Sequence, residues 1–520
     1  MARPKLLFIG LDAADSHLVR RWAAEGELPT IASLIQSGVT ASVTTPLAVL
    51  EGGIWPTFLT SSNPASHGMF SYLQLKAGTY DLEVGMYADR LPVPPFWAHL
   101  GRAGKRIAVI DAPFARPVKG LDGLQVTNWG AHDPWAWKRC SRPAGLIRDL
   151  VRRFGDHPVG MCDAAGRALG DYEDLRRRLI VGAGKKAALL RHCLQAGDWD
   201  FFCGVFSESH CAGHQFWHLT DPAHPRHEPR ASAELRAAIR DVYRAIDDGI
   251  ATVLDGLPAE TDVLVMLSHG MGPYHAGSHL LEMVLDRILG ADAEPGADAG
   301  PGGDGHAARR ALWSIRHALP SGLRQALKAR RPDALGRLWQ WAHPTLNPWA
   351  SARAFAVPTN NMTGAIRINL QGRDPKGRVA PGREYEALCG TITEALVSLE
   401  NAETGRAAVQ WVRRAAELYQ GPRLDKLPDL FVEWDHSAPI NSVRSPRIGT
   451  VTRPFRDERT GDHRQGGLLV GRGPSFRSGE VKAGIRTEDI GPTILDLFGV
   501  ASPPEFEGKT ALPYLRAPRS

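Results

Sequence analysis

Residues 201–218 read FFCGVFSESHCAGHQFWH, an apolar run followed directly by three histidines at intervals of four. The run 201–206 is typical of a strand in a parallel sheet, because both faces of such a strand are buried. If a helix follows this strand, His210, His214 and His218 share one helical face. Imidazoles at positions i and i+4 can bind one divalent metal ion. The alternative interpretation is a polar helix face with solvated histidines, which this spacing alone does not exclude.

Three more residues of the kinds that bind metals stand beside apolar runs elsewhere in the chain. They are Asp12 at the end of the run 5–12, His269 after the run 263–267, and His463 before the run 467–470. In open α/β sheets, sites form at the carboxyl ends of the strands. We therefore expect these side chains to meet His210 and His214 at one edge of a parallel sheet.

The composition is that of a globular protein and gives no sign of specific nucleic-acid binding. Of 520 residues, 43% are hydrophobic and 23% are charged, and the net charge of +6 is dispersed along the chain. This charge predicts a weak preference for small anionic molecules. The chain has no apolar stretch of 18 residues, so we expect no transmembrane helix. The first apolar run is short and contains Asp12, with Asp15 following, which is unlike a signal peptide.

The cysteines show no CxxC pair and no spacing typical of a disulfide framework. Several of them lie in apolar segments, which favours reduced thiols and a cytoplasmic location. Cys211, between His210 and His214, is a weaker candidate for a third metal ligand. The six residues are Cys140, Cys162, Cys193, Cys203, Cys211 and Cys389.

The length predicts a large α/β domain with an insertion rather than one small core. Residues 290–305 are rich in Gly, Ala, Asp and Pro, as in a linker, and residues 307–341 are basic and amphipathic. We therefore divide the chain into a first core part (1–286), a linker with a basic helical cap (287–350) and a second core part (351–520). The basic segment is interpreted as a packed cap helix, a lid over an anionic site or a membrane-surface helix.

Six separate segments together resemble the type I phosphodiesterase/nucleotide pyrophosphatase branch of the alkaline phosphatase superfamily. They are Gly10-Leu11-Asp12, residues 55–69 with Trp55-Pro56-Thr57 and His67-Gly68-Met69, residues 206–217, Ser268-His269-Gly270, Gly461-Asp462-His463-Arg464, and residues 489–499. The resemblance implies an α/β sandwich with a mainly parallel central sheet and helices on both faces. It also implies hydrolysis of phosphate esters at two metal ions, usually zinc, with a transiently phosphorylated Thr or Ser.

At three positions the chain departs from this family. The nucleophile falls on Glu51, the aspartate of the Asp-x-x-x-His motif falls on His210, and the aspartate of the Ser-Asp-His-Gly motif falls on Ser268. Four positions keep the residue type of the family: Asp12, His214, His269 and His463.

From these substitutions we expect one site made of three imidazoles and a second, poorer site. His210, His214 and His463 form the first, Asp12 and His269 supply the second, and Glu51 is placed to bridge both. A His-rich site suits zinc, as one or two ions, with iron or copper as alternatives. We expect Glu51 to be a ligand or a base for water, and a nucleophile that forms an acyl-phosphate is the alternative.

Four further residues are candidates for contacts with the substrate: Thr57, His275, His279 and Arg464. Pro56 suits the first turn of a helix, so Glu51 is expected just before that helix and Thr57 inside it, as a cap or a phosphate contact. His275 and His279 are equally well interpreted as solvated loop histidines. Arg464 is able to pair with an anionic group.

The expected function is a cytoplasmic metal-dependent hydrolase that acts on a small anionic phosphoester, of the phosphodiester or nucleotide type. A metalloenzyme with different chemistry on the same scaffold and a catalytically silent metal-binding protein are the alternatives. The sequence makes no prediction about the oligomeric state.

Overall fold

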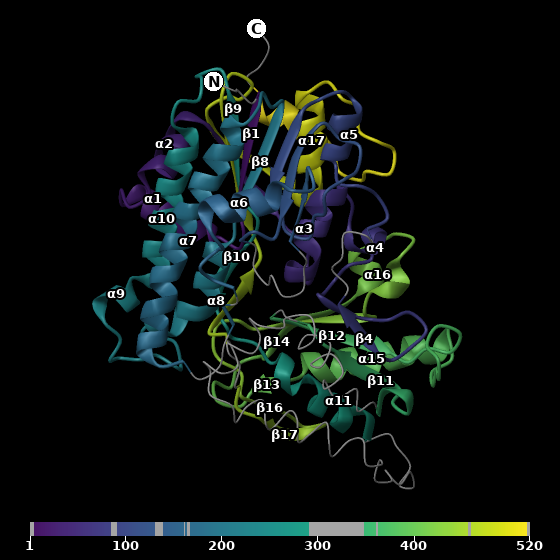
Figure 1. The fold of residues 1–520 in the computed structure, drawn as a ribbon. Coiled ribbons are helices and arrows are strands. Elements are labelled where there is room, and N and C mark those ends of the chain that lie inside the picture. Colours follow the sequence, from purple (N-terminus) through teal and green to yellow (C-terminus); the bar gives the residue numbers. More distant parts are fainter. Residues whose placement is uncertain are drawn as a thin grey trace. The chain divides into compact units, whose positions relative to one another are not determined.

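The computed structural model describes residues 5–84, 91–130, 139–160, 162–163, 167–290, 348–359, 362–455 and 459–516 (Figure 1). The chain divides into two compact units. The first unit comprises residues 1–63, 87–273 and 458–520, and the second comprises residues 64–86 and 274–457. These boundaries differ from those expected at 286 and 351, because the chain after Pro273 builds a sheet of its own. Most of the predicted linker and basic cap, 287–350, lies outside the described residues.

The first unit is built on a nine-stranded sheet with the order β20-β2-β19-β9-β1-β8-β5-β6-β7. Its centre is a run of parallel strands, and β19 and β7 are antiparallel to their neighbours. This arrangement confirms the predicted α/β fold with a mainly parallel central sheet. The strands are β1 (Leu6–Leu11), β2 (Val39–Thr44), β5 (Ile107–Ile110), β6 (Gly123–Thr127), β7 (Cys140–Arg142), β8 (Phe201–Phe206), β9 (Asp262–Leu267), β19 (Gly467–Arg472) and β20 (Gly479–Arg486).

Helices cover both faces of this sheet, which explains why its central strands are apolar throughout. Along β1, Leu7 and Ile9 pack into one core, and Leu6 and Phe8 pack into the other. Burial of each such side chain contributes about 1.5–3 kcal/mol. The first face carries α1 (Ser16–Ala24), α2 (Pro29–Ser37), α7 (Leu169–Gln195), α8 (Glu208–Thr220) and α10 (Ala238–Leu254).

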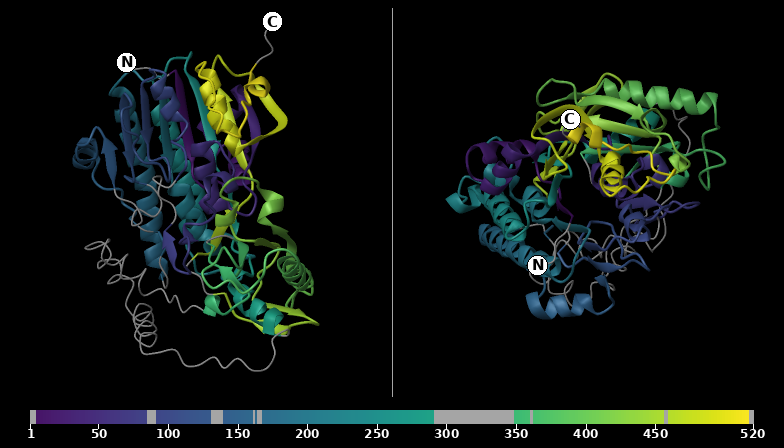
Figure 2. Two further views of the ribbon diagram at one scale, coloured as in Figure 1. Left: turned by 90° about the vertical axis from the view of Figure 1, so that its right-hand side faces the viewer. Right: turned by 90° about the horizontal axis from the view of Figure 1, so that it is seen from above.

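The opposite face carries α3 (Leu50–Thr60), α5 (Trp97–Arg102), α17 (Ile490–Leu497) and α18 (Leu512–Leu515). Figures 1 and 2 show α17, in yellow, across the sheet from α7 and α10. The helix that was expected to begin at Pro56 begins at Leu50, so Pro56 lies inside it. Its buried residues Trp55 and Phe58 pack on the sheet, and this packing favours the longer helix over the usual first-turn position of proline.

A two-stranded ribbon extends the first unit beyond the carboxyl edge of its sheet. In this ribbon, β10 (Gly270–Pro273) pairs antiparallel with β18 (Gly461–Arg464), and Met271 lies opposite His463. Because β10 follows β9 after only two residues, the ribbon brings His463 to the end of β9. Among the described residues, no helix is both long and apolar enough to cross a bilayer.

The second unit has a four-stranded antiparallel sheet with the order β11-β12-β15-β14. These strands are β11 (Ala354–Val357), β12 (Thr363–Ile368), β15 (Leu430–Trp434) and β14 (Val409–Arg414), and α11 (Leu281–Gly290) and α15 (Arg383–Val397) share their core. Smaller sheets join β3 (Leu73–Leu75) with β4 (Leu82–Val84), and β13 (Glu400–Asn401) with β16 (Ser442–Ser445) and β17 (Gly449–Thr452).

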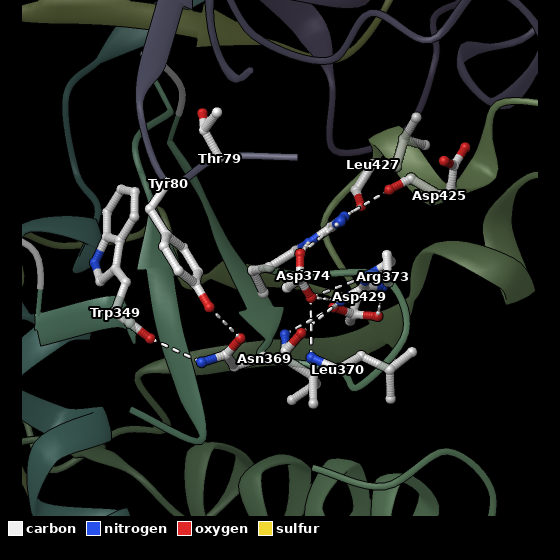
Figure 3. Close-up of polar contacts among 12 residues, drawn as sticks. Thr79, Tyr80, Trp349, Asn369, Leu370, Arg373, Asp374, Asp425, Leu427 and Asp429 are labelled. Carbon is white, nitrogen blue, oxygen red and sulfur yellow. Dashed lines mark hydrogen bonds and ion pairs between the residues drawn. The ribbon is translucent and has the colours of Figure 1, made fainter. Parts of the chain in front are cut away.

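Buried ion pairs hold the end of β12 in the second unit (Figure 3). The carboxylate of Asp429 accepts bonds of 2.8 Å from both terminal nitrogens of Arg373, and one of 2.7 Å from the backbone N–H of Ile368. The Tyr385 hydroxyl donates a further bond of 3.0 Å to it. Four donors on one carboxylate leave it fully satisfied, which indicates a structural role.

Candidate metal centre

Three adjacent strands of the first unit deliver the predicted site residues to one edge. Leu11, the last residue of β1, lies level with Phe206 at the end of β8 and with Leu267 at the end of β9. The chain therefore leaves the sheet at the same level in three places: at Asp12 after β1, between β8 and α8, and at Ser268 after β9. This register places residues more than 190 positions apart along the chain within bonding distance: Ser209 Oγ donates a bond of 2.6 Å to the Asp12 carbonyl.

Three histidines converge at this edge through their Nε2 atoms. His210 Nε2 lies 2.9 Å from His214 Nε2 and 3.0 Å from His463 Nε2. The nitrogens of all three residues lie within 4.8 Å of one another, and all three residues are buried. His210 and His214 stand one turn apart on α8, and His463 comes from β18. The structure thus brings together the three imidazoles that the sequence predicts.

Hydrogen bonds at Nδ1 fix the tautomer of two of these rings. His210 Nδ1 lies 2.7 Å from Asp12 Oδ2, and His214 Nδ1 lies 2.8 Å from the Gly461 carbonyl oxygen. An ionised carboxylate and a carbonyl only accept hydrogen bonds, so each Nδ1 carries the proton. The Nε2 atoms of the two neutral rings then carry no proton, and their lone pairs face each other. Such an arrangement is repulsive without a cation, and it is how proteins orient histidines that bind metals.

The third ring faces the same point through its Nε2 atom, which lies 3.0 Å from His210 Nε2. Its Nδ1 lies 3.4 Å from Oδ1 of Asp462, the residue before it, but makes no hydrogen bond among the described residues. Gly461 lets α8 approach this closely, because a Cβ there would overlap the Trp217 ring and the Gly213 carbonyl oxygen. The donor set therefore fits a divalent ion such as zinc, which binds imidazole nitrogen at about 2.0–2.1 Å.

Burial and neighbouring side chains set the charges of His463 and Asp12 in this centre. Burial lowers the pKa of His463 well below its ordinary value, and the neighbouring imidazoles of His269, His214 and His210 lower it further. For Asp12, burial acts to raise the pKa, but His210 and the other polar neighbours outweigh it and hold the pKa below its usual range. At neutral pH, therefore, His463 is uncharged and Asp12 is ionised.

His269 lies beside this group, and Ser268 links it to Asp12. His269 Nδ1 is 2.9 Å from Ser268 Oγ, which lies 3.4 Å from Asp12 Oδ1. The ring of His269 is centred 4.7 Å from that of His463. Its Nε2 is buried and makes no hydrogen bond among the residues that the structure describes. Burial lowers the pKa of His269 to about 3, so the ring is neutral.

The remaining predicted site residues of the first unit have different surroundings. Glu51 lies in the first turn of α3 rather than before it, and its side chain is outside the described part of the chain. Thr57 is fully buried within the same helix. The guanidinium of Arg464 packs on Gly272, where a Cβ would overlap it. The Nε atom of Arg464 makes no hydrogen bond within the described residues. His218 points to Thr460 Oγ1, at 3.1 Å.

The other two candidates for substrate contact belong to the second unit. There, His275 Nδ1 lies 3.2 Å from the His436 carbonyl oxygen, and His279 Nε2 lies 2.8 Å from the Arg453 carbonyl oxygen. Both histidines therefore hold neighbouring loops of that unit. The cysteine between His210 and His214, Cys211, is buried and is not part of the group of described residues that could hold an ion.

Three residues of the centre had no predicted role. Asp462 Oδ1 accepts a bond of 2.8 Å from the backbone N–H of His463, Ser268 links His269 to Asp12, and Trp55 Nε1 donates a bond of 2.7 Å to Asp12 Oδ1. For Asp462 the signal was its place directly before a predicted ligand. Nothing in the spacing of the sequence indicates Trp55.

Comparisons with known proteins agree with this fold. The model of the family described as type I phosphodiesterase / nucleotide pyrophosphatase matches residues 6–343, more than half of the chain. Two solved structures of phosphonoacetate hydrolase from Sinorhizobium meliloti 1021, in complex with phosphonoformate and with phosphonoacetate, are similar with a TM-score of 0.54. Each has 13% sequence identity and covers 94% of both chains, a likeness that shows the fold alone. No curated protein sequence matches.

Proposed function

The chain belongs to the type I phosphodiesterase/nucleotide pyrophosphatase family and is a phosphoester hydrolase of the alkaline phosphatase superfamily; from this premise we propose that its activity depends on a divalent metal ion. The proposed ligands are His210, His214 and His463. The proposed substrate is a small anionic ester of the phosphodiester or nucleotide type.

The observation that carries this proposal is the convergence of the three Nε2 atoms. Two of the rings, those of His210 and His214, have an acceptor behind the Nδ1 atom, at 2.7 Å and 2.8 Å. Burial of unprotonated Nε2 atoms that face one another costs free energy unless a cation binds between them. Zinc is the proposed ion because it favours nitrogen ligands without a strict geometry, and iron and copper are the alternatives.

When bound, a divalent ion supplies Lewis acidity that draws charge from a phosphoryl oxygen. The residues of the chain set how strong that effect is. Three neutral imidazoles leave the charge of the ion nearly uncompensated, so an anionic ester is attracted to it. Asp12 partly offsets this charge from behind His210, and Arg464, with its Nε unbonded among the described residues, is proposed to pair with the anionic substrate.

Glu51 is the proposed catalytic residue. It stands where the resemblance places a hydroxyl nucleophile, and its position in the first turn of α3 is in the same unit as the three histidines. A carboxylate is a poorer nucleophile than an activated hydroxyl but a good proton acceptor, so we propose that Glu51 takes the proton of the attacking water. Direct attack by water then replaces the phosphorylated enzyme.

Metal analysis together with a substrate panel tests the proposed function. The purified protein should contain zinc or iron, lose activity with a chelator and regain it when the ion is restored. It should hydrolyse a p-nitrophenyl phosphodiester or phosphomonoester. A protein that binds metal but hydrolyses neither ester would contradict the phosphoester substrate, and one that hydrolyses an ester with no metal bound would contradict metal dependence.

The proposed location is the cytoplasm. None of the six cysteines of the chain forms a disulfide in the structure, and five of them are buried. Burial raises the pKa of Cys193 to about 12, which keeps this thiol protonated and unreactive. Unreactive, unpaired thiols are typical of proteins in a reducing compartment.

A further inference from the structure

Asp12 uses both of its carboxylate oxygens inside the protein. Oδ2 accepts a bond of 2.7 Å from His210 Nδ1, and Oδ1 accepts a bond of 2.7 Å from Trp55 Nε1. Ser268 Oγ lies 3.4 Å from the same Oδ1 as a further donor. The residue is only 3% exposed. Three donors, from α8, from α3 and from the connection between β9 and β10, therefore surround the carboxylate that the family resemblance assigns to a metal.

We propose that the site holds a single metal ion, bound by His210, His214 and His463, and that Asp12 is a positioning residue rather than a ligand of a second ion. This inference rests on the proposed function and deepens it. The carboxylate holds the proton of His210 on Nδ1 and so directs the lone pair of Nε2 to the other two imidazoles. Its negative charge also makes His210 a stronger donor to the ion.

Within the described part of the chain, a second ion would have too few ligands. Ser268, at the position of an aspartate in the family, offers a neutral hydroxyl that already accepts a bond of 3.1 Å from the Ala13 N–H and contacts His269 Nδ1 at 2.9 Å. Among the side chains that the structure describes, only His269 Nε2 then stays available beside Asp12. A zinc ion in a protein takes at least three protein ligands. Within the described residues, the single group that meets this need is His210, His214 and His463.

The replacement of an aspartate by His210 and the loss of one at Ser268 fit this inference together. At the first position an imidazole took the place of a carboxylate, and Asp12 became its hydrogen-bond acceptor across 2.7 Å. At the second position the hydroxyl of Ser268 donates to Asp12 instead of adding negative charge. Two adjacent carboxylates without an ion between them would repel each other, so a serine here suits a centre without a second ion.

The test counts metal ions and measures how tightly they bind. The full-length protein is loaded with Zn²⁺ and separately with Co²⁺, desalted, and analysed by elemental mass spectrometry and by competition with a chelating dye. Wild type should hold one equivalent. Asp12→Asn should still saturate at one equivalent with an affinity about 10–100-fold weaker, as is typical when the acceptor behind a ligand histidine is removed.

Three variants serve as matched controls: Ser268→Ala, His269→Ala and Glu51→Gln. Each removes a polar group near or assigned to the second site, and each should keep one equivalent and nearly the wild-type affinity. The cobalt absorption spectrum should also be unchanged in them, which is a readout independent of activity. If Asp12→Asn fails to fold, as shown by circular dichroism, Ser268→Ala and His269→Ala test the same point.

Two equivalents in wild type that fall to one in Asp12→Asn, with the remaining ion bound as tightly as before, would overturn the single-ion inference and leave the proposed function intact. A fall in stoichiometry in His269→Ala would overturn it too. No bound metal in wild type would instead refute the proposed function, and the inference with it.

Discussion

Nδ1 of His210 lies 2.7 Å from Oδ2 of Asp12, so the residue directly after the central strand β1 decides which nitrogen of His210 faces the other two histidines. Both residues are buried, and they are 198 positions apart along the chain. The contact exists because β1 and β8 are parallel and in register, with Leu11 level with Phe206. A property of the sheet therefore fixes a chemical property of the centre, namely the tautomer of a ligand.

Replacement of one ligand should remove the metal. His214→Ala is expected to lose the ion and reduce turnover to the background rate, because His214 Nε2 lies 2.9 Å from His210 Nε2 and has no substitute among the described residues. Metal content and hydrolysis of a p-nitrophenyl ester are the measurements. His218→Gln is the matched control, since His218 lies one turn further on α8 and points to Thr460. Unchanged metal content in His214→Ala would refute the ligand assignment.

Glu51→Gln separates catalysis from metal binding. The change removes a proton acceptor and keeps the size of the side chain, so turnover should fall by about 10²–10⁴-fold, the range for general acid–base catalysis. The metal content should stay at the wild-type level. Steady-state rates and elemental analysis of the same preparation check both parts. Rates like those of wild type would exclude Glu51 from the mechanism.

The stability of the protein should fall as the pH drops below neutral, partly because of His218. Burial, with the charge of Arg226 and other neighbours, lowers the pKa of His218 from 6.5 to about 4. Below pH 6.5 the imidazole of His218 is protonated in the unfolded chain but stays neutral in the folded chain. Its contribution to the free energy of unfolding is therefore fully present above pH 6.5 and is lost as the pH falls to about 4. Between about pH 7 and about pH 5 the loss is about 2 kcal/mol.

Urea unfolding at several pH values measures this loss. His218→Gln should show a shallower dependence on pH, by about the same 2 kcal/mol. Glutamine is able to keep the contact with Thr460 Oγ1 but does not titrate. Equal slopes for the two proteins over this range would show that His218 is not held neutral in the folded state.

Asp429→Asn should destabilise the second unit. The substitution removes one of the two carboxylates that pair with Arg373 in a largely buried place, and Asp374 stays as the other, so the cost should be about 1–3 kcal/mol. Glu400→Gln is the contrast, because the ion pair of Glu400 with Arg444 is half exposed and should contribute less than about 1 kcal/mol. Urea unfolding of both variants gives the two values. A loss in Asp429→Asn as small as in Glu400→Gln would show that this network adds no stability.

Much of the fold could be predicted, because the central strands are buried on both faces and are therefore apolar throughout. Strands at 201–206 and 263–267, and polar residues at their carboxyl ends, were enough to predict a parallel sheet with a site at one edge. The helix around Glu51 was predicted less well, since Pro56 suggested a start that lies six residues too late. The burial of Trp55 and Phe58 against the sheet, which decides the true start, is a tertiary effect.

The residues of the candidate centre could be named from the sequence, but their contacts could not. Asp12 was expected to bind a metal, and its acceptor role toward His210 became visible only once the distances were known. The same holds for the Gly461 carbonyl oxygen behind His214, which comes from a segment 247 positions away. Spacing along the chain shows which side chains can share a face, and it does not show which atoms point outward.

The most direct test of the three-histidine centre is an anomalous difference map from crystals of the metal-loaded protein, collected on both sides of the zinc absorption edge. We expect one strong peak, equidistant from Nε2 of His210, His214 and His463. A map with no peak among these three atoms, or with the strongest peak bound to other side chains, would contradict the account.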